Sequence, residues 1–165
     1  MEHISYQHYE LWSIADWAGD GSNANEFACS VSTSIDFPCT VEFDYDATTA
    51  DPGDVFRCGF TTSDTQTQLT TSIRMEFRPA GEFFIAEVVN SSEVGRTTDN
   101  SLYESSGTYT FELFANTTEL TNPSNSTLTH NNTNAQRTDY GFLVFDIFDD
   151  DNTNTTFSID NFKIF

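Results

Sequence analysis

Apolar side chains recur at every second position over most of this chain. In residues 40–45, valine, phenylalanine and tyrosine alternate with glutamate and aspartate. Successive side chains of a β-strand point to opposite faces of a sheet, so a period of two predicts strands with one buried and one exposed face. The same pattern returns in residues 73–78, 109–113, 139–148 and 157–165. The alternation therefore predicts an all-β protein.

Turn-forming residues separate these runs. Asp-Pro-Gly-Asp occupies residues 51–54, Pro-Ala-Gly occupies residues 79–81, and Ser-Ser-Gly occupies residues 105–107. Residues 79–81 lie between two alternating runs and predict a β-hairpin. Residues 121–138 are a long Asn/Ser/Thr tract, which we expect to be a mobile surface loop with one short edge strand near Leu128.

The spacing of runs and turns predicts about eight to eleven short strands in an antiparallel β-sandwich, a jelly roll of two sheets. No segment carries the apolar stripe with a period of 3.6 residues that marks an amphipathic helix. Because no internal repeat or linker divides the chain, residues 1–165 are expected to form a single domain. The final strand, Phe157–Phe165, has few charged residues, so we expect it to lie inside a sheet.

The strongly acidic composition excludes two classes of partner. The formal net charge is -20, with 6 lysines and arginines against 26 aspartates and glutamates. Nucleic acid and anionic membranes would be repelled, so we expect no nucleic-acid binding. No apolar run is long enough to span a bilayer, so we also expect no membrane insertion. Divalent cations, by contrast, would be attracted.

Three cysteines, Cys29, Cys39 and Cys58, leave at least one thiol without a partner in the same chain. We expect them to be small buried residues; a single Cys29–Cys39 or Cys39–Cys58 bridge is the alternative. The first residues lack the basic and apolar regions of a signal peptide. The expected location is an extracellular surface or a virion, reached without a signal peptide in this chain.

Four local patterns together resemble the concanavalin A-like, or laminin G-like, jelly-roll superfamily. They are a Trp-Ala-Gly-Asp-Gly turn at residues 17–21, the strand pattern of residues 40–45, a Tyr-x-Phe-x-Leu hairpin pattern within residues 107–120, and Phe-Ser-Ile-Asp-Asn-Phe-Lys-Ile at residues 157–164. Thr117 stands where the hairpin of the superfamily usually has Gly. Its members include lectins, carbohydrate-binding modules, glucanases and phage virion proteins, so the resemblance implies a β-sandwich and leaves the function open.

Acidic residues gather in short clusters that suit Ca²⁺, which takes hard oxygen ligands. They include Asp16 with Asp20 and the run at residues 149–152. In related carbohydrate-binding modules, the Asp of the closing Ile-Asp pair often joins N-terminal residues around a structural calcium, and that Asp is Asp160 here. A Ca²⁺ held by Asp16, Asp20 and Asp160 is therefore one expectation. The alternative is that these carboxylates are solvated in turns and keep the surface charged.

One carboxylate pattern hints at catalysis. Glu42, Asp44 and Asp46 alternate along one strand, which places neighbouring carboxylates of the set roughly 6–7 Å apart on one face. Jelly-roll glucanases carry Glu-x-Asp-x-Glu in this way, and such a separation suits glycoside hydrolysis. Asp46 replaces the final Glu, and its shorter side chain would misplace the proton donor. We therefore expect no enzymatic activity and interpret these residues as the polar face of a strand.

Aromatic side chains that flank the strands are candidates for stacking on sugar rings. The candidate ligand-binding residues are Trp17, Trp12, Tyr103 and Tyr140. Large aromatic residues are more often packed in or beside a core, which is the alternative interpretation. Trp17, next to the Gly-Asp-Gly turn, is the better candidate for a ring that faces a ligand.

Two functions compete on these observations. The first is a non-catalytic binding module, carbohydrate-binding or adhesive, which rests on the superfamily resemblance, the aromatic residues and the expected calcium. The second is a structural virion surface protein, such as a phage decoration or fibre protein, or a filament subunit. It rests on the Asn/Thr/Ser-rich surface and the single lysine, Lys163. The expected partner is accordingly a glycan or a protein, with a homo-oligomer or assembly into a larger particle under the second function.

Overall fold

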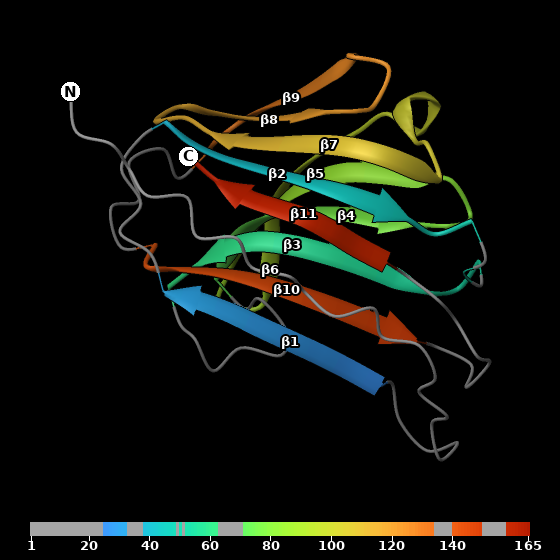
Figure 1. Cartoon of the computed structure of the whole chain (residues 1–165). Helices are drawn as coiled ribbons and strands as arrows, with labels where there is room; N and C mark the ends of the chain where they lie inside the picture. Colours follow the sequence, from blue (N-terminus) through green and yellow to red (C-terminus); the bar gives the residue numbers. More distant parts are fainter. Residues whose placement is uncertain are drawn as a thin grey trace.

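Two antiparallel β-sheets stacked face to face make up the protein (Figure 1). The computed structural model describes residues 25–32, 38–48, 50, 52–62, 71–133, 140–149 and 158–165. These residues form eleven strands and one 3-10 turn, η1 (Asn100–Leu102). The predicted all-β class, antiparallel pairing and two-sheet sandwich are confirmed.

The larger sheet has six strands. Their spatial order is β1 (Asn25–Ser32), β10 (Phe142–Asp149), β3 (Val55–Thr61), β4 (Ser72–Arg78), β5 (Glu82–Val89) and β6 (Ser92–Thr98). The smaller sheet has five strands. Their order is β11 (Ser158–Ile164), β2 (Cys39–Asp46), β7 (Ser106–Leu113), β8 (Thr117–Thr121) and β9 (Thr127–Asn131).

The chain changes sheet several times, and this gives the sandwich its topology. Strands β3 to β6 follow one another as neighbours in the larger sheet, and β7 to β9 do so in the smaller one. Strand β10 then returns to pair with both β1 and β3, and β11 adds to β2 (Figure 1). Strands far apart in sequence are therefore hydrogen-bonded neighbours. None of the described residues forms a helix with the length and apolar character needed to cross a bilayer.

Aromatic rings fill the space between the sheets. Phe77 of β4 is fully buried and lies at the centre, with its ring centroid 4.6 Å from that of Tyr109, 5.1 Å from Tyr45 and 5.2 Å from Phe83. Centroid separations of about 4.5–7 Å are those of favourable aromatic pairs. The Tyr109 hydroxyl donates a hydrogen bond to the backbone oxygen of Glu104 at 2.6 Å, which satisfies the polar end of a buried ring. The alternation in the sequence directs these rings inward.

Cys39 of β2 and Cys58 of β3 are buried free thiols on the inner faces of the two sheets. Burial raises the pKa of Cys39 to about 11, so the thiol stays protonated and packs as a small apolar group. The expectation of buried, unbridged cysteines is confirmed for this pair. The side chain of Cys29 lies outside the described set.

Two sequence expectations differ from the structure. Much of the tract at residues 121–138 is ordered: residues 122–126 make a tight turn, and Thr127–Asn131 is the edge strand β9, which buries Leu128 and His130 on its inner face. The short edge strand expected near Leu128 is confirmed, and threonine on the outer face of a strand is compatible with its pairing. Among the described strands, the closing strand β11 pairs only with β2, at the edge of the smaller sheet instead of inside it. Lys163 of β11 forms an ion pair with Glu42 of β2. A lysine on an edge strand discourages pairing with the strand of another molecule.

A buried polar cluster joins the free edges of the two sheets. His130 of β9 lies with its Nδ1 3.0 Å from the Thr97 hydroxyl of β6 and its Nε2 3.9 Å from a carboxylate oxygen of Glu87 in β5. The Glu87 carboxylate also accepts hydrogen bonds from the backbone and hydroxyl of Thr133. Gly95 permits the close approach, because a Cβ there would lie 3.2 Å from the His130 ring.

This cluster makes stability depend on pH. Burial lowers the pKa of His130 below its usual 6.5, with the Glu87 carboxylate opposing the shift. The unfolded chain therefore binds a proton on this histidine at a higher pH than the folded chain does. Acidification through the range just below pH 6.5 is expected to lower the free energy of unfolding. Urea denaturation across that range would measure the slope, and a His130→Asn variant should show a shallower one. An unchanged slope in the variant would assign the pH dependence to other groups.

Candidate functional site

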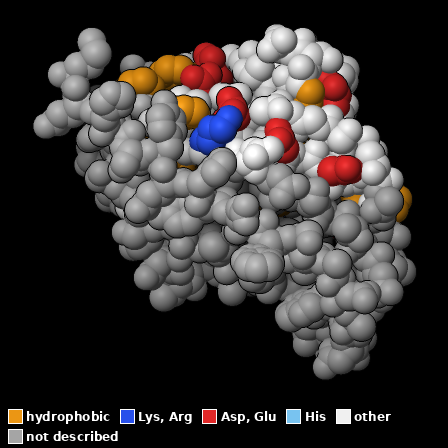
Figure 2. Space-filling view, viewed as in Figure 1, with side chains coloured by type: hydrophobic (Ala, Val, Ile, Leu, Met, Phe, Trp, Pro, Cys, Tyr) orange, Lys and Arg blue, Asp and Glu red, His pale blue; other side chains and the backbone are white. Residues whose placement is uncertain are grey.

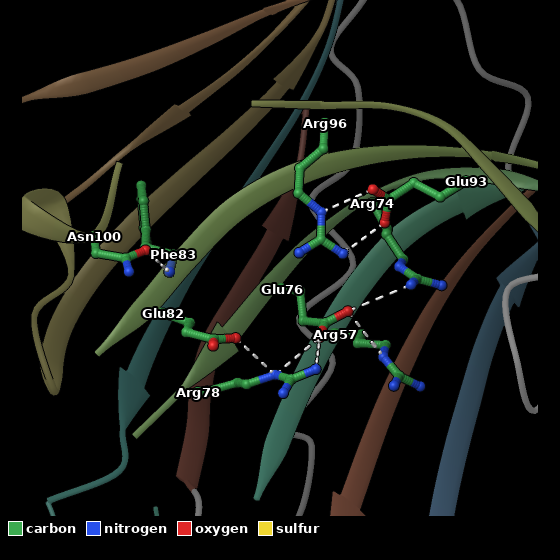
Figure 3. Close-up of polar contacts among 9 residues, drawn as sticks. All are labelled: Arg57, Arg74, Glu76, Arg78, Glu82, Phe83, Glu93, Arg96 and Asn100. Carbon is green, nitrogen blue, oxygen red and sulfur yellow. Dashed lines mark hydrogen bonds and ion pairs between the residues drawn. The ribbon is translucent and has the colours of Figure 1, made fainter. Parts of the chain in front are cut away.

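The solvent side of the larger sheet carries a connected set of charged side chains. In β4, Arg74, Glu76 and Arg78 project from this face, while the residues between them enter the core. Arg57 of β3 is the register partner of Glu76. On the other side of β4 from Arg57, the set continues with Glu82 of β5 and with Glu93 and Arg96 of β6 (Figure 3). We name the set the arginine cluster; its members are Arg57, Arg74, Glu76, Arg78, Glu82, Glu93 and Arg96.

Glu76 is the centre of the arginine cluster. Its side chain is only 2% exposed. One oxygen, Oε2, lies 3.2 Å from Arg57 Nε and 3.4 Å from Arg74 Nη2. The other oxygen, Oε1, lies 2.9 Å from Arg78 Nη2 and 3.2 Å from its Nε (Figure 3). One buried carboxylate therefore orients three guanidinium planes, and each hydrogen bond to it is charge-assisted.

The outer members of the arginine cluster form two ion pairs that are open to solvent. Arg78 Nε lies 3.1 Å from Glu82 Oε2 across the β4–β5 hairpin. Arg96 binds Glu93 with two parallel hydrogen bonds of 2.9 and 2.6 Å. The hydrogen bonds to Glu93 raise the pKa of Arg96. These four side chains are 37–44% exposed.

Phe84 lies beneath Arg96. The guanidinium carbon is 3.9 Å from the centroid of the ring, which is 1% exposed. This is cation–π geometry with a covered ring. The aromatic face is therefore used to hold Arg96 in place, and the exposed chemistry of the arginine cluster is polar.

A glycine lies beside Arg74 in the neighbouring strand. Gly59 of β3 is the register partner of Arg74. A Cβ at position 59 would lie 2.8 Å from the Cβ of Arg74 and 3.0 Å from the backbone oxygen of Ile73. Glycine at position 59 therefore permits the close approach of β3 and β4 beside Arg74.

The arginine cluster concentrates most cations of an acidic protein on one face. It contains four of the five arginines in a chain with a formal net charge of -20. Its four guanidiniums face three carboxylates, so exposed donors and acceptors alternate over a short distance. Forked guanidinium donors beside carboxylate acceptors match neighbouring hydroxyl groups, each of which both donates and accepts. This arrangement suits a polyhydroxylated ligand.

None of the candidate residues from sequence analysis that the structure describes belongs to the arginine cluster. Trp12, Trp17, Asp16 and Asp20 fall outside the described residues. Tyr140 is buried in the core, and Tyr103 packs against the core with its hydroxyl facing that of Tyr45. Their role in ligand binding stays a prediction.

The expected calcium site is likewise not assembled by the described residues, which contain no group of three or more His, Cys, Asp or Glu able to hold a metal. Asp160 is the register partner of Asp44, and its side chain is not described. The Asp44 carboxylate accepts hydrogen bonds from Asn161 and Thr108. A Ca²⁺ at Asp160 stays a prediction.

The carboxylates of β2 are each bound to a neighbour. Glu42 pairs with Lys163, and Asp46 accepts hydrogen bonds from the backbone and hydroxyl of Thr48. Hydrogen bonds from Asn161 and Thr108 lower the pKa of Asp44, and those from Thr48 lower the pKa of Asp46. A general acid needs a raised pKa. Neither aspartate is therefore suited to the proton-donor role of the glucanase pattern.

The arginine cluster was not predicted from the sequence, although the sequence contains a signal for it. Arg-x-Glu-x-Arg in residues 74–78 and Glu-x-x-Arg in residues 93–96 place opposite charges on exposed faces of strands. Such charges suggest ion pairs only once the strands are known to be neighbours.

Known structures of similar shape are galectins. The chicken galectin-2 structure matches with a TM-score of 0.56 and 9% identity, covering 87% of this chain and 100% of that one. Sheep galectin-11, in complex with glycerol, gives 0.56 and 12% over the same shares. A toad ovary galectin, in complex with N-acetylgalactose, gives 0.56 and 7%, covering 83% and 97%. The fold is that of the concanavalin A-like jelly-roll superfamily.

This galectin-like sandwich confirms the resemblance drawn from the sequence patterns. No family model matches the chain, and no match was found among curated proteins. At 7–12% identity the likeness establishes the fold.

Proposed function

We propose that this galectin-like chain is a non-catalytic carbohydrate-binding module and that its saccharide binds on the arginine cluster. The observation that carries the proposal is that the cluster has two levels, an inner group of charged residues and an outer group that is exposed to solvent. Glu76 is buried and Arg57 and Arg74 are partly buried, and together they form a base beneath the exposed groups of Arg78, Glu82, Glu93 and Arg96. Donors and acceptors held in place before binding lose little side-chain freedom when a ligand arrives.

Proteins of the same fold support the choice of ligand class. The toad ovary galectin was solved with N-acetylgalactose, and congerin II, with a TM-score of 0.53, was solved with lactose. Both ligands are neutral and rich in hydroxyls. The exposed groups of the arginine cluster offer the mixed donors and acceptors that such a ligand needs.

A glycan array followed by calorimetric titration tests the proposal. Lactose and N-acetylgalactose are the first soluble probes because of the neighbouring structures. Replacing Arg78 and Arg96 together with glutamine removes two forked donors and keeps the bulk of the side chains. We expect Kd to rise by at least about tenfold, since each lost charge-assisted hydrogen bond removes about 1.5–3 kcal/mol.

Lys163→Gln is the matched control. It removes one cation from the smaller sheet, and we expect it to leave Kd unchanged. Glycan retention that survives the double substitution would place the sugar elsewhere on the protein. A defined oligomer that retains no glycan at all would contradict the proposal and support the structural-subunit function instead.

A further inference from the structure

A pocket lies on the outer side of the smaller sheet, away from the arginine cluster of the larger sheet. It is a pocket of about 450 Å³ at the end of the smaller sheet where β7 ends and β8 begins. Its lining residues are Pro38, Phe114, Ala115, Asn116, Thr117 and Glu119. Ligand pockets are typically about 300–1,000 Å³. In Figure 2, hydrophobic side chains lie beside acidic ones at the upper left of this face.

The loop that builds the pocket is held rigidly. The backbone nitrogen of Phe114 donates to the oxygen of Thr117 at 2.9 Å and closes the turn. Asn132, which follows β9, makes two hydrogen bonds to the turn. Its backbone nitrogen donates to the backbone oxygen of Asn116 at 3.0 Å, and its side-chain nitrogen donates to the backbone oxygen of Phe114 at 3.4 Å. The Asn132 side-chain oxygen in turn accepts a hydrogen bond from Thr118 at 2.8 Å. The turn therefore presents its side chains in a fixed arrangement.

The side chains of the pocket divide into an apolar platform and a polar rim. Phe114 is half-buried, and together with Pro38 and Ala115 it offers an apolar surface beside the sheet. Asn116 and Glu119 reach the same space, and within the described part of the chain their side chains make no hydrogen bond. An aromatic platform with a few polar groups around it is the usual composition of a small-molecule site.

The negative charge around the pocket favours cationic sugars over anionic ones. Glu119 is the register partner of Glu112 on β7, so a second carboxylate lies on the strand position next to Glu119. The same face of the sheet carries Glu42, Asp44 and Asp46, against which the described residues set one cation, Lys163. An acidic sugar would be repelled here, and a protonated amine would be attracted.

We propose that this pocket binds an amino sugar. The apolar face of one pyranose ring packs on Phe114, the amide of Asn116 and the hydroxyl of Thr117 bind ring hydroxyls, and the protonated amine pairs with Glu119. The site is separate from the arginine cluster and does not rest on the function proposed for it.

Titration of the full chain with two oligosaccharides of equal length tests the proposal. One is an oligomer of glucosamine with free amines, and the other is its fully N-acetylated form, which keeps the rings and loses the charge. We expect the free-amine oligomer to bind at least about tenfold more tightly, because an ion-paired hydrogen bond is about twice as strong as a neutral one. Glu119→Gln, which preserves shape and removes charge, should bring the two affinities within about twofold of each other.

Phe114→Ala should weaken both oligosaccharides, since it removes the platform, and a melting curve will show that the variant is folded. Asp99→Asn removes an exposed carboxylate outside both sites and keeps the side-chain oxygen that accepts a hydrogen bond from Ser101, so it should alter neither affinity. Equal binding of the two oligosaccharides, no binding of either, or a preference that persists in Glu119→Gln would overturn the proposal. The Arg78/Arg96 double variant should still bind the free-amine oligomer, so failure at one site is distinguishable from failure at the other.

Discussion

Glu76→Ala is expected to lower the free energy of unfolding by about 3–5 kcal/mol, the range for removing one partner of a buried ion pair. The substitution deletes the one carboxylate that three guanidiniums share. Arg57 and Arg74, whose side chains are 17% and 14% exposed, would then lie close together with their shared counter-charge removed. Repulsion between the two guanidiniums and the loss of their interactions with Glu76 act in the same direction.

Urea denaturation measures this change, and Glu82→Ala is the matched control. Glu82 also pairs with Arg78, but its side chain is 44% exposed. Solvent screens such a pair, so its loss is expected to alter stability by about 0–1 kcal/mol. A double variant that adds Arg74→Met to Glu76→Ala should recover part of the loss, because it removes one of the like charges that Glu76 holds together. Equal effects of Glu76→Ala and Glu82→Ala would show that burial of the central carboxylate is energetically irrelevant.

Phe77→Ala is expected to destabilise the protein by about 3–5 kcal/mol, which is typical of truncating a buried phenylalanine. The ring lies among Phe43, Tyr45, Phe56, Phe83 and Tyr109, with centroid distances between 4.6 and 6.5 Å. Its removal leaves a cavity between the two sheets that rigid neighbours on both sides cannot fill. Lost burial and lost ring contacts add to the effect.

The same denaturation assay compares Phe77→Ala with two other variants. Phe77→Leu keeps most of the apolar volume and should cost less. Phe165→Ala changes a side chain that is 48% exposed and should stay within about 0.5 kcal/mol of the parent protein. A loss at Phe77 no larger than that at Phe165 would contradict the placement of Phe77 at the centre of the core.

The strands could be predicted from sequence because their signal is local. A period of two is visible within a few residues, as in residues 40–45 and 73–78, and the structure places strands at both. Their order could not be predicted in the same way. The pairing of β10 with both β1 and β3 joins residues from opposite ends of the chain. No nearby residue records such a contact.

The arginine cluster was hidden for a related reason. Arg57 and Glu76 are 19 residues apart, and only the register of β3 against β4 brings them together. In β6, a register shift between Glu87 and Val88 of β5 decides where Glu93 and Arg96 lie. The residues predicted from the sequence to bind a ligand were aromatic instead, and two of them, Tyr103 and Tyr140, lie with the core.

The two levels of the arginine cluster have a consequence for how this protein can vary over time. Substitutions at the exposed members, such as Glu82, Glu93 and Arg96, alter what an approaching molecule meets while the buried base stays intact. Substitution at Glu76 threatens folding itself. During evolution, the exposed residues of the arginine cluster can therefore change and alter ligand binding, while the residues around Glu76 are constrained by folding. A designed library that randomises the rim and preserves the base would exploit the same separation.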